Sequence, residues 1–309
     1  MSGVLYSPTS IIMYYLLYGL FFMLSLIPWW MLYLVSNFIY VVLYYLAGYR
    51  KDVVMSNITI AFPTKTNAEK IRIAKDFYKN FIDTFIETVK LFSISDRAFA
   101  KRMTGNFELL ADLYKTGKNV QLNGGHFFNW EYINWGLARN SPYKFIGLYA
   151  PLSNKSADRL MYNMRSRYKT LLLNAYNFKT SFHDIARGRY AMGLAADQNP
   201  PSPEKSFWID FFGRPTAFFM GPEKGAKINN LAVVFVNYYK VKRGYYHIEL
   251  SLVTTNPKEM PNGEMTARYV AFLEDCIRKR PSNYLWSHRR WKHQFKEEFS
   301  HNIIARHQE

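Results

Sequence analysis

A long uncharged segment near the start of the chain constrains its architecture more than any other sequence feature. Residues 11–47 are strongly apolar and essentially free of charge, and Pro28 divides them into two runs, 11–27 and 29–47. Each run is close to the roughly 20 residues that a helix needs to cross a bilayer. The segment therefore predicts a membrane anchor.

The flanks of this segment favour a retained anchor over a signal peptide. A signal peptide needs a basic start and a short apolar stretch before a cleavage site. Residues 1–10 contain no Lys or Arg, and the apolar stretch is too long. We expect an anchor over residues 1–48 and a folded domain over residues 49–309. One kinked span, a hairpin, and a span followed by an interfacial helix all fit this pattern.

Composition points to an anionic partner. The 309 residues include 40 Lys and Arg against 23 Asp and Glu, a formal net charge of +17. Membrane headgroups, nucleic acid or an acidic protein would suit this charge. Aromatic residues make up 18% of the chain, and Tyr and Trp favour membrane interfaces, which favours lipid unless these rings simply fill the core. The single cysteine, Cys276, excludes an intramolecular disulfide.

The pattern after Pro63 predicts an α/β domain. Apolar residues recur at helical spacing between positions 68 and 92, which indicates one or two amphipathic helices. Further along, short apolar runs alternate with helical patterns, which is typical of a central, mostly parallel sheet flanked by helices. We expect strands at 119–122, 143–149 and 190–196, a hairpin formed by 232–241 and 245–253, and helices at 129–138, 157–168, 217–229 and 266–280.

The sharpest chemical signal lies in residues 124–131, Gly-Gly-His-Phe-Phe-Asn-Trp-Glu. They follow a predicted strand, so they should lie at the edge of the sheet where open α/β folds bind ligands. Glu131, about one helical turn beyond His126, is placed to accept a hydrogen bond from one imidazole nitrogen. The other nitrogen is then free to take a proton from a hydroxyl. Because no nucleophilic Ser or Cys stands beside this pair, the acceptor hydroxyl would itself attack an acyl thioester.

A structural interpretation competes with this one. The pair would then only stabilise a loop, and the His-x4-Glu spacing alone is a weak motif. The diglycine turn, the preceding strand and the anchor together favour catalysis. A zinc site is less attractive, because the chain has no His-Glu-x-x-His motif and no clustered Cys, so we expect no metal and no cofactor.

Further motifs occur in a characteristic order along the chain. They are Asn-Ile-Thr-Ile-Ala-Phe-Pro at 57–63, His-x4-Glu at 126–131, Arg-Ser-Arg at 165–167, Asp-Gln at 197–198, Phe-Gly-Arg-Pro at 212–215 and Trp-Ser-His-Arg-Arg-Trp-Lys at 286–292. In this order and spacing they resemble the bacterial lipid A biosynthesis acyltransferases, the late acyltransferases of the lysophospholipid acyltransferase superfamily. The resemblance covers nearly the whole chain.

The resemblance implies a glycerolipid acyltransferase-like α/β fold and a reaction. A fatty acyl group would pass from acyl carrier protein, or from a coenzyme A thioester, to a hydroxyl of a lipid A precursor. His126 would be the general base and Glu131 its orienter. Arg165 matches the motif arginine best, with Arg167 as the fallback, and it would stabilise an oxyanion or bind an acceptor phosphate unless it belongs to a solvated helix face. Asp197 would converge on the same pocket, unless it is a plain turn residue.

Other positions are expected to contact substrate or partner. Gly125, Asn129 and Gln198 are expected to touch the substrate. Arg289 and Arg290 would contact anionic headgroups or an acidic carrier protein, or else form a membrane-facing surface patch. Basic residues directly after the apolar segment place the rest of the chain in the cytoplasm. The resemblance implies that the anchor lies in a bacterial inner membrane.

Rival functions make different predictions. The mycobacterial mannoside acyltransferases also resemble this family, so another glycolipid or an aminolipid is an alternative acceptor. A non-catalytic module that binds anionic lipids is a second class of function, and for it His126→Ala leaves cellular activity intact. Charge alone suggests a nucleic-acid binder, but no helix-turn-helix, RNA-recognition or zinc motif is present, so we expect no nucleic-acid partner.

Overall fold

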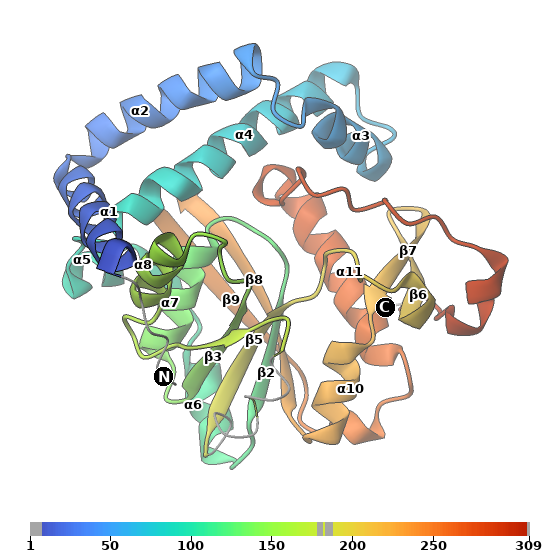
Figure 1. Ribbon diagram of the computed structural model, residues 1–309. Coiled ribbons are helices and arrows are strands. Elements are labelled where there is room, and N and C mark those ends of the chain that lie inside the picture. Colours follow the sequence, from blue (N-terminus) through green and yellow to red (C-terminus); the bar gives the residue numbers. More distant parts are fainter. Residues whose placement is uncertain (1–7, 178–181, 183–187, 308–309) are drawn as a thin grey trace.

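The computed structural model describes residues 8–177, 182 and 188–307, and these form an α/β architecture (Figure 1). The strands of the main sheet are β1 (Met103–Gly105), β2 (Val120–Gly124), β3 (Lys144–Tyr149), β4 (Leu171–Asn174), β5 (Tyr190–Ala195), β8 (Ala232–Lys242) and β9 (Tyr245–Thr254). Within the described residues they lie in the order β1-β9-β8-β2-β5-β3-β4. Every neighbouring pair is parallel except the hairpin β8–β9. The predicted fold class is therefore confirmed.

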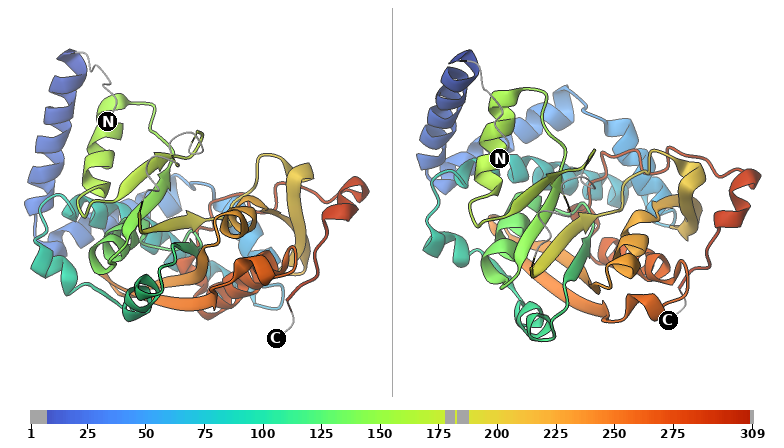
Figure 2. Two further views of the ribbon diagram at one scale, coloured as in Figure 1. Left: turned by 90° about the horizontal axis from the view of Figure 1, so that it is seen from below. Right: turned by 60° about the horizontal axis from the view of Figure 1, so that its bottom comes forward.

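Helices surround this sheet. They are α1 (Pro8–Leu26), α2 (Trp29–Val41, continued by a π-helical turn at Val42–Leu46), α3 (Lys51–Ala61), α4 (Asn67–Lys90), α5 (Asp96–Ala100), α6 (Glu108–Lys115), α7 (Trp130–Asn140), α8 (Lys155–Arg165), α10 (Gly221–Ile228) and α11 (Glu264–Lys279). α7 and α8 lie on one face of the sheet, and α10 and α11 lie toward the other (Figures 1 and 2). Because both faces are covered, all residues of β2 are buried, as expected for a central parallel strand.

Local sequence explains where several elements begin. α4 starts at a capping box, in which Thr66 Oγ1 accepts from the Glu69 amide and the Glu69 carboxylate accepts from the Thr66 amide at 2.8 Å. α7 starts where the Asn129 side chain accepts from the amides of Glu131 and Tyr132. This cap sets the direction in which α7 leaves the turn after β2.

One predicted helix is partly wrong. The segment 217–229 was expected to be helical throughout, but its first residues belong to β7 (Arg214–Phe219), which pairs with β6 (Ser206–Phe211) in a separate two-stranded sheet. Phe212 and Gly213 both have positive φ, at 56° and 76°, and form the tight turn between these strands. α10 begins only at Gly221. The other predicted strands and helices are present with boundaries shifted by a few residues.

The two apolar runs of the N-terminal segment form separate helices. α1 and the continuous helix Trp29–Leu46 are both long and apolar enough to cross a membrane. α1 packs against α8 and α4, and α2 runs beside α4 (Figures 1 and 2). The outer sides of both helices expose large apolar residues. They are thus suited to serve as an anchor.

Strand register places the ends of two strands side by side. β2 and β5 are adjacent and parallel, with Gly124 opposite Ala195. His126 lies two residues beyond Gly124, and Asp197 lies two residues beyond Ala195. The fold therefore brings these two side chains to the same point on the carboxyl edge of the sheet.

Candidate active site

His126 stands on a turn that two distant tyrosines hold in place. Tyr269 donates its hydroxyl proton to the Gly124 carbonyl at 2.6 Å, and Tyr238 donates to the Gly125 carbonyl at 2.7 Å. Both bonds are buried, so the turn carries no unpaired carbonyl at these two positions. Nothing in the local sequence identified these tyrosines, because they come from β8 and α11.

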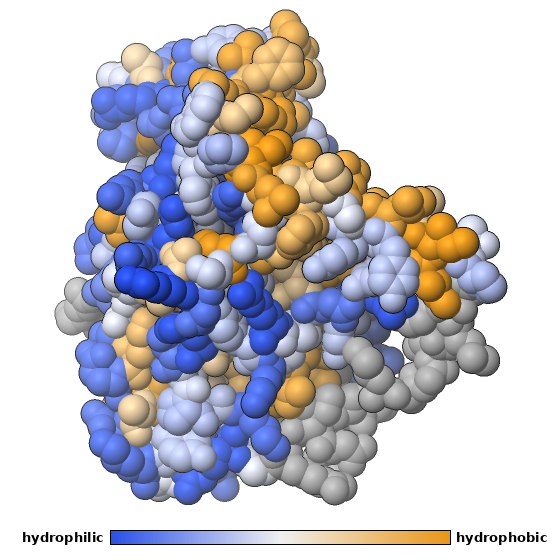
Figure 3. Space-filling view, turned by 90° about the vertical axis from the view of Figure 1, so that its left-hand side faces the viewer, coloured by the Kyte–Doolittle hydropathy of each residue, from blue (hydrophilic) through white to orange (hydrophobic). Residues whose placement is uncertain are grey.

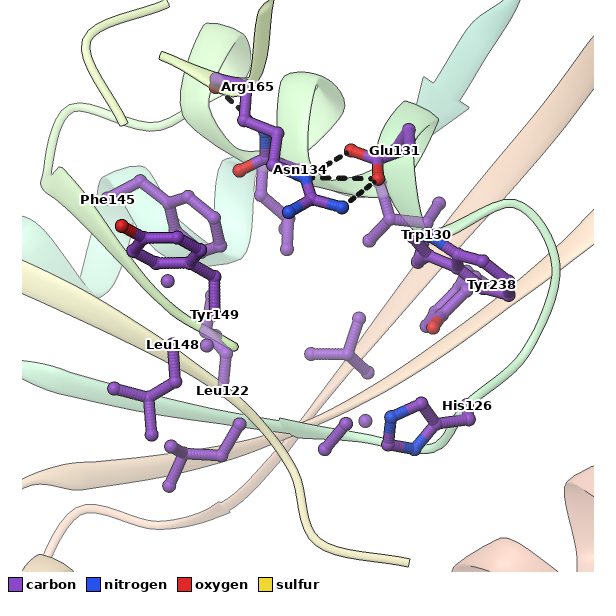
Figure 4. Close-up of a pocket in the computed structure, with 18 of the residues that line it drawn as sticks. Leu122, His126, Trp130, Glu131, Asn134, Phe145, Leu148, Tyr149, Arg165 and Tyr238 are labelled. Carbon is purple, nitrogen blue, oxygen red and sulfur yellow. Dashed lines mark hydrogen bonds and ion pairs between the residues drawn. The ribbon is translucent and has the colours of Figure 1, made fainter. Parts of the chain in front are cut away.

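His126 forms a close pair with Asp197. Its Nδ1 lies 2.6 Å from Asp197 Oδ1, and its backbone amide donates to Asp197 Oδ2 at 2.9 Å. The Asp197 side chain is 1% exposed, whereas the His126 side chain is 29% exposed. With Nδ1 engaged, Nε2 is left on the cavity side, and Figure 4 shows the imidazole pointing into the cavity. This is the base–orienter geometry that proton transfer requires.

His126 and Asp197 shift each other's pKa. Burial by itself would lower the pKa of the His126 imidazole, but the charge and hydrogen bond of Asp197 outweigh it and leave the pKa raised. Burial would raise the pKa of the Asp197 carboxyl, but His126 and its amide outweigh this and lower it. Both shifts favour an ionised Asp197 beside a protonated His126.

The expected hydrogen bond between His126 and Glu131 is not present, which corrects the assignment of the orienting acid. Glu131 instead binds Arg165, whose Nε lies 3.0 Å from both carboxylate oxygens. The helical start of α7 turns Glu131 toward the end of α8, while β5 supplies the carboxylate beside His126. Figure 4 shows the Glu131–Arg165 pair across the cavity from His126.

A cavity of about 450 Å³ joins these two groups. His126, Gly125, Glu131 and Arg165 form polar parts of its wall. The remaining wall is largely apolar and comes from β2, β3, β4, β5, α7 and their loops, with Leu122, Ile133, Leu137, Phe145, Leu148, Leu152, Leu172 and Leu194. Tyr238 and Trp130 also line the cavity, and the sequence did not identify Tyr238 as part of a site. The arrangement suits a substrate with a reactive polar end and a hydrocarbon tail.

Several predicted residues do not line this cavity, among them Arg167, Asn129 and Gln198. Arg167 donates to the carbonyls of Leu91 and Ile94 and stacks over the Trp135 ring, so it stabilises the end of α8. Asn129 is fully buried as the cap of α7 and does not reach the cavity, which corrects its expected contact with substrate. Gln198 is half-buried and is not part of the cavity wall.

The two C-terminal arginines differ from each other. Arg290 is 2% exposed and donates to Asn199 Oδ1 and to the Ala217 carbonyl, so it is too buried to contact headgroups or a carrier protein as expected. Its charge instead helps to lower the pKa of Asp197. Arg289 is exposed but does not line the cavity.

Asn57 explains why two distant motifs occur together. Its amide donates to the carbonyls of Trp286 and His288, both at 2.7 Å, and so ties α3 to the C-terminal motif. His288 Nε2 in turn accepts from the Asn199 amide in the segment after Asp197. These motifs therefore support the loop that carries Asp197. In the part of the chain that the structure describes, no group of three or more His, Cys, Asp or Glu side chains is arranged to hold a metal ion.

Comparison with known proteins agrees with this geometry. Residues 4–293 match the family model described as bacterial lipid A biosynthesis acyltransferase. The chain is also 24% identical, over 249 residues, to the lipid A biosynthesis lauroyltransferase of Escherichia coli strain K12, and the match covers 79% of each chain. A polar pair at the end of an apolar cavity is what acyl transfer onto a hydroxyl needs. The chain therefore belongs to the bacterial lipid A biosynthesis acyltransferase family and is an O-acyltransferase.

Proposed function

We propose that this protein transfers a fatty acyl group from a thioester of acyl carrier protein or coenzyme A to a hydroxyl of a lipid A precursor, with His126 as general base and Asp197 as its orienter. The observation that carries the proposal is the His126–Asp197 pair, with one imidazole nitrogen bound at 2.6 Å and the other facing a largely apolar cavity. The related protein named lipid A biosynthesis lauroyltransferase supports lipid A as the acceptor class.

The reaction is a direct transfer. Nε2 of His126 takes the proton of the acceptor hydroxyl while that oxygen attacks the thioester carbonyl. The new carbon–oxygen bond gives a tetrahedral intermediate, whose collapse breaks the carbon–sulfur bond. The leaving thiolate then takes the proton from His126, so the products are an ester and a free thiol, and the enzyme returns to its starting state. Asp197 stabilises the transient imidazolium.

Arg165 contributes positive charge on the opposite wall. Its Nε and Nη2 donate to the Glu131 carboxylate, whereas its Nη1 makes no hydrogen bond to that carboxylate. We assign Arg165 to the oxyanion of the intermediate or to an acceptor phosphate, and Glu131 to holding the guanidinium in place. The apolar wall accommodates the acyl chain. In this proposal Gly125 allows close approach of the substrate to the turn.

We place the enzyme at the bacterial inner membrane with the domain that contains His126 on the cytoplasmic side. Exposed apolar side chains on α1 and α2 support membrane attachment. Arg50 and Lys51 follow these helices, and basic residues beside an anchor favour the anionic cytoplasmic leaflet, which supports the cytoplasmic side.

The test is transfer of a labelled acyl group in purified membranes. We expect His126→Ala to lower the rate by about 10²–10⁴-fold, because the proton acceptor is lost. His301→Ala, which removes an exposed histidine near the C-terminus, serves as the control and should transfer normally. Mass spectrometry of lipid A from cells with and without the protein should show a difference of one acyl chain. Full transfer by folded His126→Ala would contradict the assignment of the base.

A further inference from the structure

The outer side of α2 is a continuous apolar stripe. Trp30, Leu34, Phe38, Val41 and Tyr45 recur at helical spacing, and all five are exposed, with Phe38 at 70%. Figure 3 shows exposed apolar side chains gathered in a band on the face formed by the N-terminal helices. A soluble domain rarely leaves such a band uncovered.

The inner side of α2 is polar and docked on the folded domain. Near the middle of the helix, Ser36 donates to Asp83 at 2.6 Å and Tyr33 donates to Glu87 at 3.1 Å, both on α4. Asn37 Oδ1 accepts from Arg243 at 2.7 Å in the β8–β9 hairpin. The central part of α2 is therefore fixed to charged groups of a domain that carries the active site.

Cationic side chains accompany α2 along its whole length. Each of them lies over an aromatic ring of the helix: Arg102 over Trp29 at 4.0 Å, Arg243 over Tyr33 at 4.6 Å, Lys79 over Tyr40 at 5.6 Å, Lys51 over Tyr44 at 4.4 Å and Lys75 over Tyr45 at 5.5 Å. We call these five residues the cationic row. Aromatic rings and long basic side chains of this kind are typical of the boundary between lipid and water.

The cationic row is incompatible with α2 crossing a bilayer. The helix from residue 29 to residue 45 rises about 24 Å, close to the thickness of the hydrocarbon core. A crossing helix would place Arg243 and Lys79 near mid-membrane, where each charge costs at least about 2.5–3.5 kcal/mol. It would also draw the exposed polar side of α4, beside which α2 runs, into lipid. A helix lying in the plane of the surface places every member of the row at headgroup depth.

We propose that α2 lies in the plane of the membrane, with its apolar stripe inserted into one leaflet and the three lysines of the cationic row bound to the headgroups of an anionic phospholipid surface. Charge complementarity selects this partner, since the chain carries a net charge of +17 and the stripe is bordered by Lys and Arg. α1 belongs to the same face, and it is docked on α8 through Asn163, which donates to the Tyr14 hydroxyl at 3.1 Å. The proposal does not depend on the chemistry at His126.

The first test measures depth at three positions of α2. Nitroxide labels on Trp30→Cys, Phe38→Cys and Tyr45→Cys all lie on the apolar stripe, at intervals of about 12 Å and about 10.5 Å along the helix. The native Cys276 is buried, and the unsubstituted chain measures its background labelling. The full chain is reconstituted in vesicles of phosphatidylglycerol and phosphatidylethanolamine, and collision with oxygen and a nickel chelate reports the depth of each label.

An in-plane helix gives the same shallow depth at all three positions, about 5–10 Å below the headgroups. A label at Phe38 that lies about 10 Å deeper than both others would establish a spanning helix and overturn the proposal. A steady change in depth from Trp30 to Tyr45 would also overturn it. So would three labels open to water, which would mean that this face does not enter the lipid.

The second test concerns the cationic row. Lys75→Gln with Lys79→Gln should weaken co-flotation of the full chain with anionic vesicles about 25-fold, since each lysine near such a surface contributes about fivefold. Lys115→Gln with Lys296→Gln is the matched control, because these exposed lysines, like Lys79, lie beside an acid, but they belong to α6 and to the C-terminal segment that packs on β6. Equal weakening by both pairs, or by neither, would show that the row does not bind headgroups.

Discussion

At the scale of single residues, the two acids of the site have separate partners. Asp197 binds His126, and Glu131 binds Arg165 across the cavity. One acid therefore orients the imidazole through the nitrogen that faces away from the cavity, and the other positions a fixed positive charge. Exchanging either acid for its amide should have effects that can be told apart by their dependence on pH.

Asp197→Asn should lower the transfer rate by about 10²-fold or more and move the loss of activity to lower pH. His126 works only when deprotonated, so activity falls as pH drops below the pKa of its imidazole. Asp197 raises that pKa, and its removal lowers it. A pH–rate profile of purified enzyme measures both effects. Glu131→Gln is the control, because it leaves Asp197 in place and should keep the original acidic limb.

Arg165→Ala should lower kcat/KM for acyl transfer by about 10²-fold, because it removes the charge that faces the reacting atoms. Arg167→Ala should transfer at close to the normal rate but lower the free energy of unfolding by about 1–3 kcal/mol, because Arg167 only binds two backbone carbonyls and a ring. Steady-state kinetics and denaturation in detergent distinguish the two variants. The reverse ranking of activity would move the functional charge to Arg167.

At the scale of elements, the sheet register shapes the apolar end of the cavity. Leu122, Gly193, Gly147 and Leu172 lie opposite one another on four neighbouring strands. All four line the cavity, and the two adjacent glycines leave room between the sheet and α7. The length of acyl chain that fits should depend on this space.

Gly147→Val should shift the preferred donor toward shorter acyl chains. A Cβ at Gly147 meets its nearest neighbour, Leu172, at 3.5 Å, so the backbone tolerates a side chain that fills the cavity. Gly193 is a poorer choice for this test, because a Cβ there would approach the Phe145 ring to 2.9 Å. Rates with a series of donors of increasing length measure the shift, and Gly147→Ala should be intermediate. A uniform loss of rate at every length would contradict this role for Gly147.

At the scale of the whole molecule, one buried carboxylate connects three parts of the chain. Asp83 on α4 accepts from Ser36 on α2, from Lys240 at 2.9 Å and from Arg243 at 2.9 Å in the β8–β9 hairpin. Burial would raise the pKa of this carboxyl, but its cationic partners outweigh burial and lower it. Its stabilising effect is therefore present above the pKa of the unfolded chain and is lost as pH falls through the lowered value.

Asp83→Ala should lower the free energy of unfolding by about 3–5 kcal/mol, because two partly buried cations lose their common partner. Thermal or denaturant unfolding of the purified protein in detergent measures this loss. Asp76→Ala is the matched control on the same helix, since Asp76 pairs with Lys79 at the surface and should contribute less than about 1 kcal/mol. If both variants lowered the free energy of unfolding by the same small amount, Asp83 would not hold α2 to the domain.

Sequence alone determined the features that depend on local periodicity. The alternation of apolar runs predicted the parallel sheet and its helices, and the diglycine turn placed His126 at a strand end. The uncharged N-terminal runs predicted an apolar anchor, but they left open whether it is one kinked helix or two separate ones. These predictions succeeded because side-chain spacing and turn residues encode the type of an element within a short stretch of chain.

Tertiary structure decided which of these elements meet. Asp197 is 71 residues from His126 along the chain, and the two side chains meet only because β5 is the neighbour of β2. Each of the two residues lies two positions after the end of its strand. The sequence contains this coincidence, but it is informative only once the two strands are known to be neighbours. The burial of Arg290 and the polar docking of α2 also follow from long-range packing. Local patterns cannot supply such facts, because contact between distant segments depends on strand order and register, which a pattern of apolar residues does not specify.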